Sequence, residues 1–294
     1  MVFEKLKDGS ISLEDEFVVS ENAWRQGGSR MFLNLGEKVK LEDLLRGVII
    51  QSGNDACVTI AEGISGSEEA FTQLMNEKAR ELNLKNSQFA NSTGWPHDEH
   101  YMSPRDLATL ALIIIKDFPE YYHYFAELEF THNNIKQGNR NELLWKDRSI
   151  DGLKTGHADK AGFGVVVSGF DGKRRRVIAV VNGLKSNKER TEEAGSLLKY
   201  GLLNFENIKI AEKNASLAKL KLANAKSDYI EIKADNDLVF TVPKGKAKDL
   251  KVNINYLAPI VPPIKQGDKI GEIEVILANE TIKAYEILAP ENID

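Results

Sequence analysis

The pattern of apolar residues changes character twice along this 294-residue sequence, and these changes limit what the chain can fold into. Before Ile150, apolar residues recur mainly at helical spacing. Residues 163–170 and 177–184 are β-branched runs joined by a polar turn, which predicts a hairpin, and residues 189–205 return to helical spacing. We therefore expect an α+β domain over residues 1–207, with helices on an antiparallel sheet.

The remaining residues, 208–294, show short apolar runs with partial alternation, separated by Pro243, Gly245, Pro262, Pro263 and Gly267. Runs of this kind predict strands between turns. The expected strands cover residues 229–232, 238–242, 250–256, 269–277 and 281–288. Several short strands at this spacing predict a small β-sandwich as a second domain.

Charge and cysteine content exclude several classes of function. The formal net charge is −5, and we expect no nucleic-acid partner. The basic run at residues 173–176 is interpreted as solvated charge at a hairpin tip. The only cysteine, Cys57, lies in an apolar helical pattern and is expected to be a small buried hydrophobic residue rather than a nucleophile. A single cysteine permits no disulfide within the chain.

No segment predicts a membrane span, a signal peptide or a metal site. The densest apolar run, Leu107 to Ile115, is interrupted by Thr109 and predicts a core helix. The N-terminus lacks a basic segment followed by an apolar one. The histidines, at positions 97, 100, 123, 132 and 157, do not fall at zincin spacing with acidic residues, so neither a metal nor a cofactor is expected.

A Ser-x-Asn triplet, Ser52-Gly53-Asn54, lies where two helical patterns meet. Glycine there permits a backbone turn that other residues resist, and the turn can expose a hydroxyl and a carboxamide together. Taken alone, the triplet is better explained as a helix junction capped by Ser and Asn.

A second triplet, Lys154-Thr155-Gly156, lies at the start of the hairpin region. On a strand, Lys154 and Gly156 point to one face and Thr155 to the other. Glycine lets a ligand approach the backbone, and an ammonium beside a hydroxyl suits a substrate carboxylate and carbonyl. Alone, this triplet is better explained as an edge-strand lysine before a turn.

The two triplets in this order resemble the active-site serine penicillin-binding proteins and β-lactamases. The surrounding sequence resembles the low-molecular-mass, serine-type D-alanyl-D-alanine carboxypeptidases over nearly the whole chain. The matching segments cover residues 52–56, 89–94, 105–108, 152–157 and 159–162. The resemblance implies a penicillin-binding, β-lactamase-like domain that removes the terminal D-Ala from peptidoglycan stem peptides.

The resemblance also implies roles for the triplet residues. Ser52 would relay a proton toward the leaving amine, and Asn54 would orient substrate and catalytic groups. Lys154 would supply positive charge near the substrate carboxylate and polarise Ser52, and Thr155 would hydrogen-bond that carboxylate.

Further substrate contacts follow from the same resemblance. Gly156 leaves the backbone open to the substrate, and the N–H of His157 would form half of an oxyanion hole. Arg190 aligns loosely with a family arginine near the substrate carboxylate, and a surface helix arginine is the open alternative.

The family's nucleophile and general base lie in a Ser-x-x-Lys motif, which we expect to fall before Met1. Two later matches, Ser196–Lys199 and Ser216–Lys219, follow Lys154 and stand in the wrong order. We therefore expect a chain that lacks half of a central helix, opens an apolar cleft near Ile49 and Val165, and is inactive as written.

Three readings of function remain open from the sequence. The chain is a carboxypeptidase without its start, a non-catalytic protein that binds cell-wall peptides, or a β-lactamase, and the β-rich tail favours the first over the third. The expected partner is a stem peptide ending in D-Ala-D-Ala, with β-lactams as inhibitors if a nucleophile is restored. The intact family member is expected in the periplasm, at the membrane only through an added C-terminal anchor.

Overall fold

The computed structural model describes residues 1–172 and 175–293, and the chain divides into two compact units. Unit 1 covers Met1–Leu202 and unit 2 covers Leu203–Asp294. The boundary that the sequence predicts, after residue 207, lies a few residues further along the chain.

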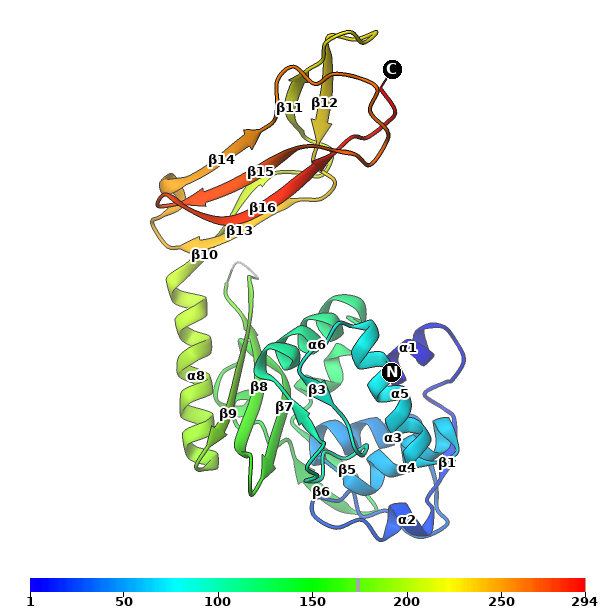
Figure 1. Ribbon diagram of the computed structural model, residues 1–294. Coiled ribbons are helices and arrows are strands. Elements are labelled where there is room, and N and C mark those ends of the chain that lie inside the picture. Colours follow the sequence, from blue (N-terminus) through cyan, green and yellow to red (C-terminus); the bar gives the residue numbers. More distant parts are fainter. Residues whose placement is uncertain (173–174, 294) are drawn as a thin grey trace. The chain divides into compact units, whose positions relative to one another are not determined.

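Unit 1 carries the helices and a central sheet (Figure 1). The α-helices are α1 (Val2–Lys7), α2 (Glu21–Trp24), α3 (Leu41–Arg46), α4 (Asn54–Ser65), α5 (Glu68–Glu81), α6 (Pro104–Asp117), α7 (Leu143–Lys146) and α8 (Asn187–Asn204). Unit 1 also contains a π-helical turn, η1 (Gly47–Gln51), which is wider than an α-helix, and a 3-10 helix, η2 (Tyr122–Ala126), which is tighter. The small strands are β1 (Glu16–Val18), β2 (Lys38–Lys40), β3 (Ser87–Gln88), β4 (Tyr101–Met102), β5 (Glu129–His132) and β6 (Ile135–Gly138).

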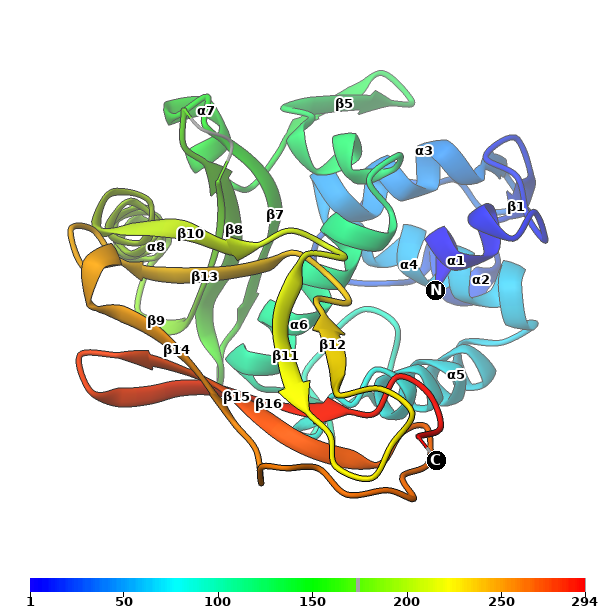
Figure 2. The same ribbon diagram turned by 90° about the horizontal axis from the view of Figure 1, so that it is seen from above.

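The central sheet is antiparallel, in the order β7 (Ile150–Ala158), β8 (Gly162–Phe170) and β9 (Arg176–Leu184). Helix α8 covers one face, and the layer that contains α3, α4 and α6 covers the other (Figures 1 and 2). The register sets Lys154 opposite Val166 and Thr155 opposite Val165. Side chains alternate along a strand, so Val166 faces the helical layer while Val165 packs with Leu198 of α8.

Helix boundaries in unit 1 follow local signals in the sequence. The Ser103 hydroxyl accepts a hydrogen bond from the Asp106 N–H at 3.1 Å, and Pro104 occupies the first helical position of α6. This confirms the predicted helix start. The core beneath α3 and α4 is aliphatic, with Leu41, Leu44 and Ile50 inaccessible to solvent.

Unit 2 is built from strands around its own core. They are β10 (Phe205–Ala211), β11 (Ser216–Lys221), β12 (Tyr229–Lys233), β13 (Leu238–Pro243), β14 (Leu250–Asn255), β15 (Lys269–Leu277) and β16 (Glu280–Leu288), with the 3-10 helix η3 (Ala247–Asp249) before β14. Strand β10 pairs with β13, β11 with β12, and β14, β15 and β16 form a third sheet. Residues such as Leu220, Ile232 and Val275 are buried, so unit 2 is the β-rich domain that the sequence predicts.

Strands β10 and β11 are absent from the sequence-based prediction. Helix α8 ends at Asn204, and Phe205, which the helical pattern includes, instead begins β10. Strand β11 was hidden because lysines at 219 and 221 are exposed on a short strand that buries Leu220. Short strands with a single buried residue give too weak an alternation to identify.

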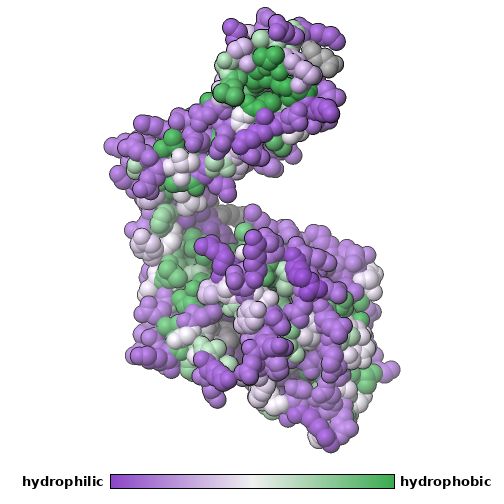
Figure 3. Space-filling model, viewed as in Figure 1, coloured by the Kyte–Doolittle hydropathy of each residue, from purple (hydrophilic) through white to green (hydrophobic). Residues whose placement is uncertain are grey.

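The surface facing the viewer in Figure 3 is mainly hydrophilic. Within the described ranges, no helix is long and apolar enough to cross a lipid bilayer.

The basic run at residues 173–176 lies partly outside the described residues, because Lys173 and Arg174 are not among them. The interpretation as solvated charge is wrong for the other two. Arg175 donates to the carbonyls of Gly201 and Leu202 at 2.9 and 2.7 Å. Arg176 donates to the two carboxylate oxygens of Asp151 through its two terminal guanidinium nitrogens, each at 2.6 Å. Arg175 thus links the segment before β9 to α8, and Arg176 links the start of β9 to β7.

Candidate active site

A π-helical turn interrupts the helices where the Ser-x-Asn triplet lies. The chain passes from η1 into α4 through Ser52, which is left-handed (φ 59°, ψ 38°). Turns and residues of this kind are rare and concentrate at functional positions. Glycine follows because a Cβ at position 53 would come within 2.9 Å of Asp55 Oδ1 and 3.0 Å of the Met31 nitrogen. The break predicted at residues 51–54 is therefore the turn that exposes the Ser52 hydroxyl.

The structure brings the two triplets together. Lys154 Nζ donates a hydrogen bond to Ser52 Oγ at 2.8 Å, although 102 positions separate the residues. A second bond runs from Nζ to the Thr155 carbonyl at 2.9 Å. Strand β7 lies at the edge of the central sheet, beside the helical layer, so its lysine reaches across to the helical break.

The ammonium group of Lys154 is enclosed, and this changes its acidity. Burial lowers the pKa of Lys154 from 10.5 to about 8. The nearby charges of Arg140 and Arg190 lower this pKa too, while Cys57 acts in the opposite direction. At neutral pH the group is still mainly protonated.

Arg140 is a member of the site that sequence reasoning missed. Its Nε atom donates to the Gln51 carbonyl at 3.1 Å, one residue before Ser52, and the side chain is exposed. No carboxylate in the described part of the chain forms an ion pair with Lys154 or Arg140. Positive charge without a protein counter-charge suits an anionic ligand, and arginine pairs well with carboxylates. Nothing in the sequence around Arg140 marks this role, because it depends on the loop folding onto η1.

Asn54 is oriented by the loop that precedes β2. Its Nδ2 atom donates to the Gly27 carbonyl at 2.8 Å, and its backbone N–H donates to the Ser29 carbonyl at 2.8 Å. The amide is therefore held in one orientation, with Oδ1 turned away from Gly27 and able to accept a hydrogen bond.

Thr155, Gly156 and His157 continue β7 beyond the lysine. Thr155 is half-buried, whereas Gly156 and His157 are exposed. The His157 ring stacks on Phe163 of β8, with ring centroids 3.9 Å apart. An added Cβ at Gly156 would meet no atom within 4 Å, so open space lies beside the backbone there. This edge is accessible to a ligand that approaches along the strand.

Arg190 is buried, so the alternative of a surface helix arginine is wrong. Only 7% of the residue is exposed on α8. Its guanidinium donates to the carbonyls of Gly156 and Gly164 at 3.2 and 3.4 Å and lies over the Phe163 ring, 5.6 Å from the centroid. Burial lowers the pKa of Arg190, although Glu142 opposes this. Arg190 therefore supports β7 and β8 from the face that α8 covers.

Cys57 lies near Lys154, on the first turns of α4. Burial raises the pKa of its thiol to about 12, which keeps the sulfur protonated and unreactive at neutral pH. The two later Ser-x-x-Lys matches lie elsewhere: Ser196 and Lys199 are exposed on α8, and Ser216 and Lys219 are exposed on β11.

An apolar cavity of about 470 Å³ lies next to Lys154, between the helical layer and the sheet. Its walls include Ile49, Ala111 and Phe125. The sequence-based expectation of a cleft near Ile49 and Val165 needs one correction, because the strand residue that lines this cavity is Val166. The neighbouring Val165 faces α8 instead.

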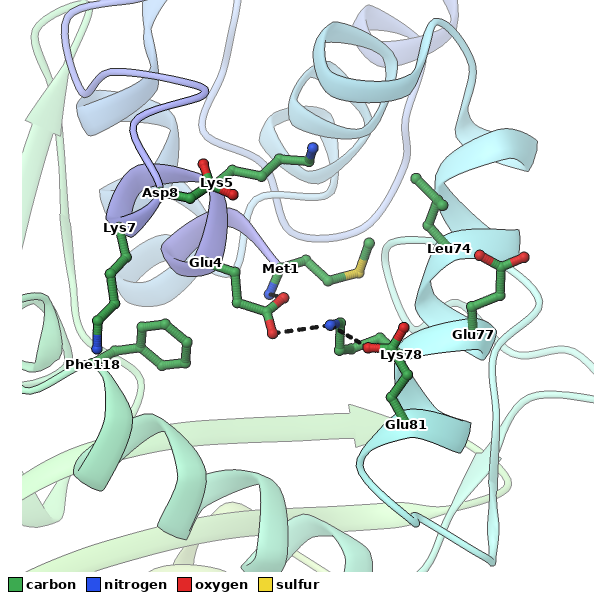
Figure 4. A pocket seen from close by; sticks show the side chains of 10 residues that line it. All are labelled: Met1, Glu4, Lys5, Lys7, Asp8, Leu74, Glu77, Lys78, Glu81 and Phe118. Carbon is green, nitrogen blue, oxygen red and sulfur yellow. Dashed lines mark hydrogen bonds and ion pairs between the residues drawn. The ribbon is translucent and has the colours of Figure 1, made fainter.

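The N-terminal residues Met1 and Glu4 line part of this cavity and are drawn in Figure 4. Lys78 of α5 lies between Glu4 of α1, at 3.1 Å, and Glu81, at 2.5 Å. Burial lowers the pKa of the Met1 amino group, although Glu4 opposes this. Helix α1 is thereby attached to α5 beside the cavity.

An α+β unit with a serine at a helical break, a lysine on the facing edge strand and a β-rich unit after it defines the class of penicillin-binding proteins. Residues 1–186 match the model of the D-alanyl-D-alanine carboxypeptidase family, and residues 205–294 match that of the C-terminal domain of penicillin-binding protein 5. The D-alanyl-D-alanine carboxypeptidase DacA of Haemophilus influenzae is 38% identical over 277 residues, covering 91% of this chain and 70% of that protein. DacA of Escherichia coli K12 is 35% identical over 301 residues, covering 100% of this chain and 74% of that protein.

Structural comparison agrees. Penicillin-binding protein 5 from Haemophilus influenzae superposes with a TM-score of 0.93 at 35% identity, covering 99% of this chain and 86% of that one. This chain belongs to the serine-type D-alanyl-D-alanine carboxypeptidase family. The family, fold class and enzyme type predicted from the sequence are thereby confirmed.

Proposed function

We propose that the site around Ser52 and Lys154 binds the carboxylate end of a peptidoglycan stem peptide that terminates in D-Ala-D-Ala. The observation that carries this proposal is the 2.8 Å contact between Lys154 and Ser52, with the charge of Arg140 nearby and, among the described residues, no carboxylate ion-paired to Lys154 or Arg140. A buried cation of this kind is stabilised by an anion that enters the site.

The substrate carboxylate would lie between Lys154, the Thr155 hydroxyl and the exposed guanidinium of Arg140. Each charge-assisted hydrogen bond contributes about 1.5–3 kcal/mol, so two or three of them would hold the C-terminal carboxylate of the peptide in one position. Arg190 would add positive potential through β7, since its Nη1 atom donates to the Gly156 and Gly164 carbonyls and its Nη2 atom donates to Asn187 Oδ1.

The scissile carbonyl would follow, beside the open backbone at Gly156 and the N–H of His157. Ser52 would carry a proton from Lys154 toward the leaving amine. Asn54 would accept a hydrogen bond from the peptide through Oδ1, since Gly27 holds its Nδ2.

Hydrolysis by the family proceeds through an acyl-enzyme on a serine of the Ser-x-x-Lys motif, which water then cleaves. No Ser-x-x-Lys precedes Ser52 within these 294 residues. We therefore propose that the chain as given binds the peptide without hydrolysing it. The β-rich unit, which matches the C-terminal domain of penicillin-binding protein 5, disfavours the β-lactamase alternative.

The proposed substrate places the working protein in the bacterial periplasm, where stem peptides are exposed. β-Lactams would act as covalent inhibitors only when a Ser-x-x-Lys nucleophile is present. Membrane association is proposed only through an added anchor segment.

Binding of a soluble stem peptide tests the proposal. We expect a peptide ending in D-Ala-D-Ala to bind the parent chain at least tenfold more tightly than the diastereomer ending in L-Ala-L-Ala, by calorimetric titration. Lys154→Met should remove most of this binding, whereas Lys188→Met, at an exposed lysine of α8, should not. Equal affinity for the two peptides, or full binding by Lys154→Met, contradicts the proposal.

A further inference from the structure

A second pocket, of about 520 Å³, lies beside the loop that leads from α2 to β2. Its walls come from the end of α2, from this loop and from the turn between β5 and β6, and include Trp24, Phe32, Asn34, Asn133 and Asn134. Two of its aromatic side chains lie on the surface, with Trp24 41% exposed and Phe32 43% exposed. We name it the Trp24–Phe32 pocket. The proposed role of Ser52 and Lys154 makes no use of it.

The backbone of the pocket is held in a costly conformation. Phe32 has φ 68°, a left-handed value that a bulky residue adopts only under constraint. The constraint is the carboxylate of Asp55, which is inaccessible to solvent. It accepts hydrogen bonds from the N–H groups of Met31, Phe32 and Leu33 at 2.8, 2.9 and 3.2 Å. Met31 and Leu33 turn into the core while the Phe32 ring is kept at the surface.

Polar side chains also line the pocket. The Arg30 guanidinium lies 5.8 Å from the Phe32 ring centroid and donates to the Trp24 carbonyl at 3.0 Å. Asn34 and Asn133 each donate through Nδ2 to Glu37 Oε2 at 3.2 Å.

These bonds fix the carboxamides in place. Among the residues that the structure describes, no protein donor bonds to Oδ1 of Asn34 or Asn133, so both oxygens are available to a ligand. Glu37 thus acts as a shared anchor for two carboxamides that line the pocket.

We propose that the Trp24–Phe32 pocket binds a pyranose ring that carries an acetamido group. The axial C–H groups of a pyranose form an apolar face that packs on an aromatic ring, while its rim of hydroxyl and amide N–H donors matches fixed carboxamide oxygens. A pocket that presents aromatic faces together with oriented amides fits this ligand better than a purely apolar side chain.

The pocket and the candidate active site are linked through the loop that leads from α2 to β2. Asn54 takes its two fixed contacts, to Gly27 and Ser29, from this loop, which follows Trp24 and carries Phe32. The inference rests on the proposed function, since a stem peptide is attached to an acetamido sugar of the glycan strand. The pocket would hold that sugar while the peptide extends to Lys154.

A soluble tetrasaccharide of N-acetylglucosamine, titrated into the full chain and followed by ligand-observed NMR, tests the proposal. We expect saturable binding, at least fivefold tighter than that of a glucose tetrasaccharide without acetamido groups. Trp24→Ala and Phe32→Gly should each weaken binding at least tenfold. Phe32→Gly removes the ring but suits the left-handed backbone, so the fold is retained.

Trp145→Ala, at another exposed tryptophan, is the matched control and should bind normally. Lys154→Met should lose the stem peptide yet keep the tetrasaccharide, which separates this inference from the proposed function. No saturable binding, equal binding of both tetrasaccharides, or unchanged binding by a folded Phe32→Gly variant overturns the pocket assignment. Failure of the peptide titration alone overturns only the function of the Lys154 site.

Discussion

The Nζ atom of Lys154 lies 2.8 Å from the Oγ atom of Ser52, and the same ammonium group has a pKa lowered to about 8 by burial. The two facts have one origin. The edge strand β7 directs the lysine into the helical layer, where the Ser52 hydroxyl replaces part of the water that the ammonium loses. The cation is thereby held close to a hydroxyl and ready for an incoming anion.

The acidity of Lys154 is directly measurable. In protein with isotope-labelled lysine, we expect the Lys154 side chain to titrate near pH 8 by NMR. The early resonance should vanish in Lys154→Met and remain in Lys188→Met. An ordinary titration of every lysine would show that the ammonium is solvated.

The same shift makes stability depend on pH. Below about pH 8, both the folded and unfolded chains carry the Lys154 proton, and the folded chain bears the full cost of burying the charge. Between pH 8 and 10.5 only the unfolded chain retains it, so the parent should gain stability relative to Lys154→Met as pH rises. Because part of the side chain reaches solvent, we expect a gain of about 1–3 kcal/mol by urea unfolding. Identical pH profiles for the two chains would argue against the shift.

Penicillin labelling tests the catalytic prediction. Loss of the nucleophile from such a site typically lowers the rate about a millionfold. We expect the chain as given to form no covalent band with a fluorescent penicillin in a denaturing gel and to release no D-Ala from the stem peptide. A labelled band that disappears in Ser52→Ala would identify Ser52 as a nucleophile and refute this prediction.

Asp55 should be important for stability. Its carboxylate accepts hydrogen bonds from the backbone of residues 31–33 and from the Ala56 N–H at 3.0 Å. Asp55→Asn turns an amide donor toward these donors and should cost about 2–4 kcal/mol in urea unfolding. Asp98→Asn is the control, because its ion pair with Lys160 is exposed on both sides, and it should unfold like the parent. Equal behaviour of the two variants would mean that solvent or a neighbouring loop replaces the lost bonds.

The apolar cavity beside Lys154 should tolerate extra volume. Ala111 lines it from α6, so Ala111→Leu adds apolar atoms to unfilled space and should stabilise unit 1 by about 1 kcal/mol, raising its melting temperature by about 2–4 °C. Ala194→Leu adds the same atoms to the packed core under α8 and should destabilise instead. If both variants lower the melting temperature, the cavity is filled or closed in solution.

Sequence patterns predicted the helical break and the strand that form the site, but they did not predict the charged residues around it. The helical break at Ser52 was predictable because glycine and polar residues interrupt an apolar pattern, and the strand at Lys154 because β-branched runs follow it. Residue order and resemblance then placed both in one site.

The residues that sequence reasoning missed make their contacts with segments that are distant in the sequence, and only the folded chain brings these together. Arg140 reaches the site only because its loop contacts Gln51, and the role of Asp55 depends on residues 23 and 24 positions earlier. The burial of Arg190 was equally hidden, because its partners are backbone carbonyls on β7 and β8, which leave no mark in the sequence.

A peptide pair tests the central claim most directly, that the Lys154 cluster binds the free carboxylate of the peptide. Affinities for a stem peptide ending in D-Ala-D-Ala and for its C-terminal amide are measured by calorimetry with the parent and with Lys154→Met. We predict that the parent prefers the acid by at least tenfold and that Lys154→Met reduces this preference to about twofold or less. An amide that binds the parent as tightly as the acid, or a preference that survives in Lys154→Met, would contradict the account.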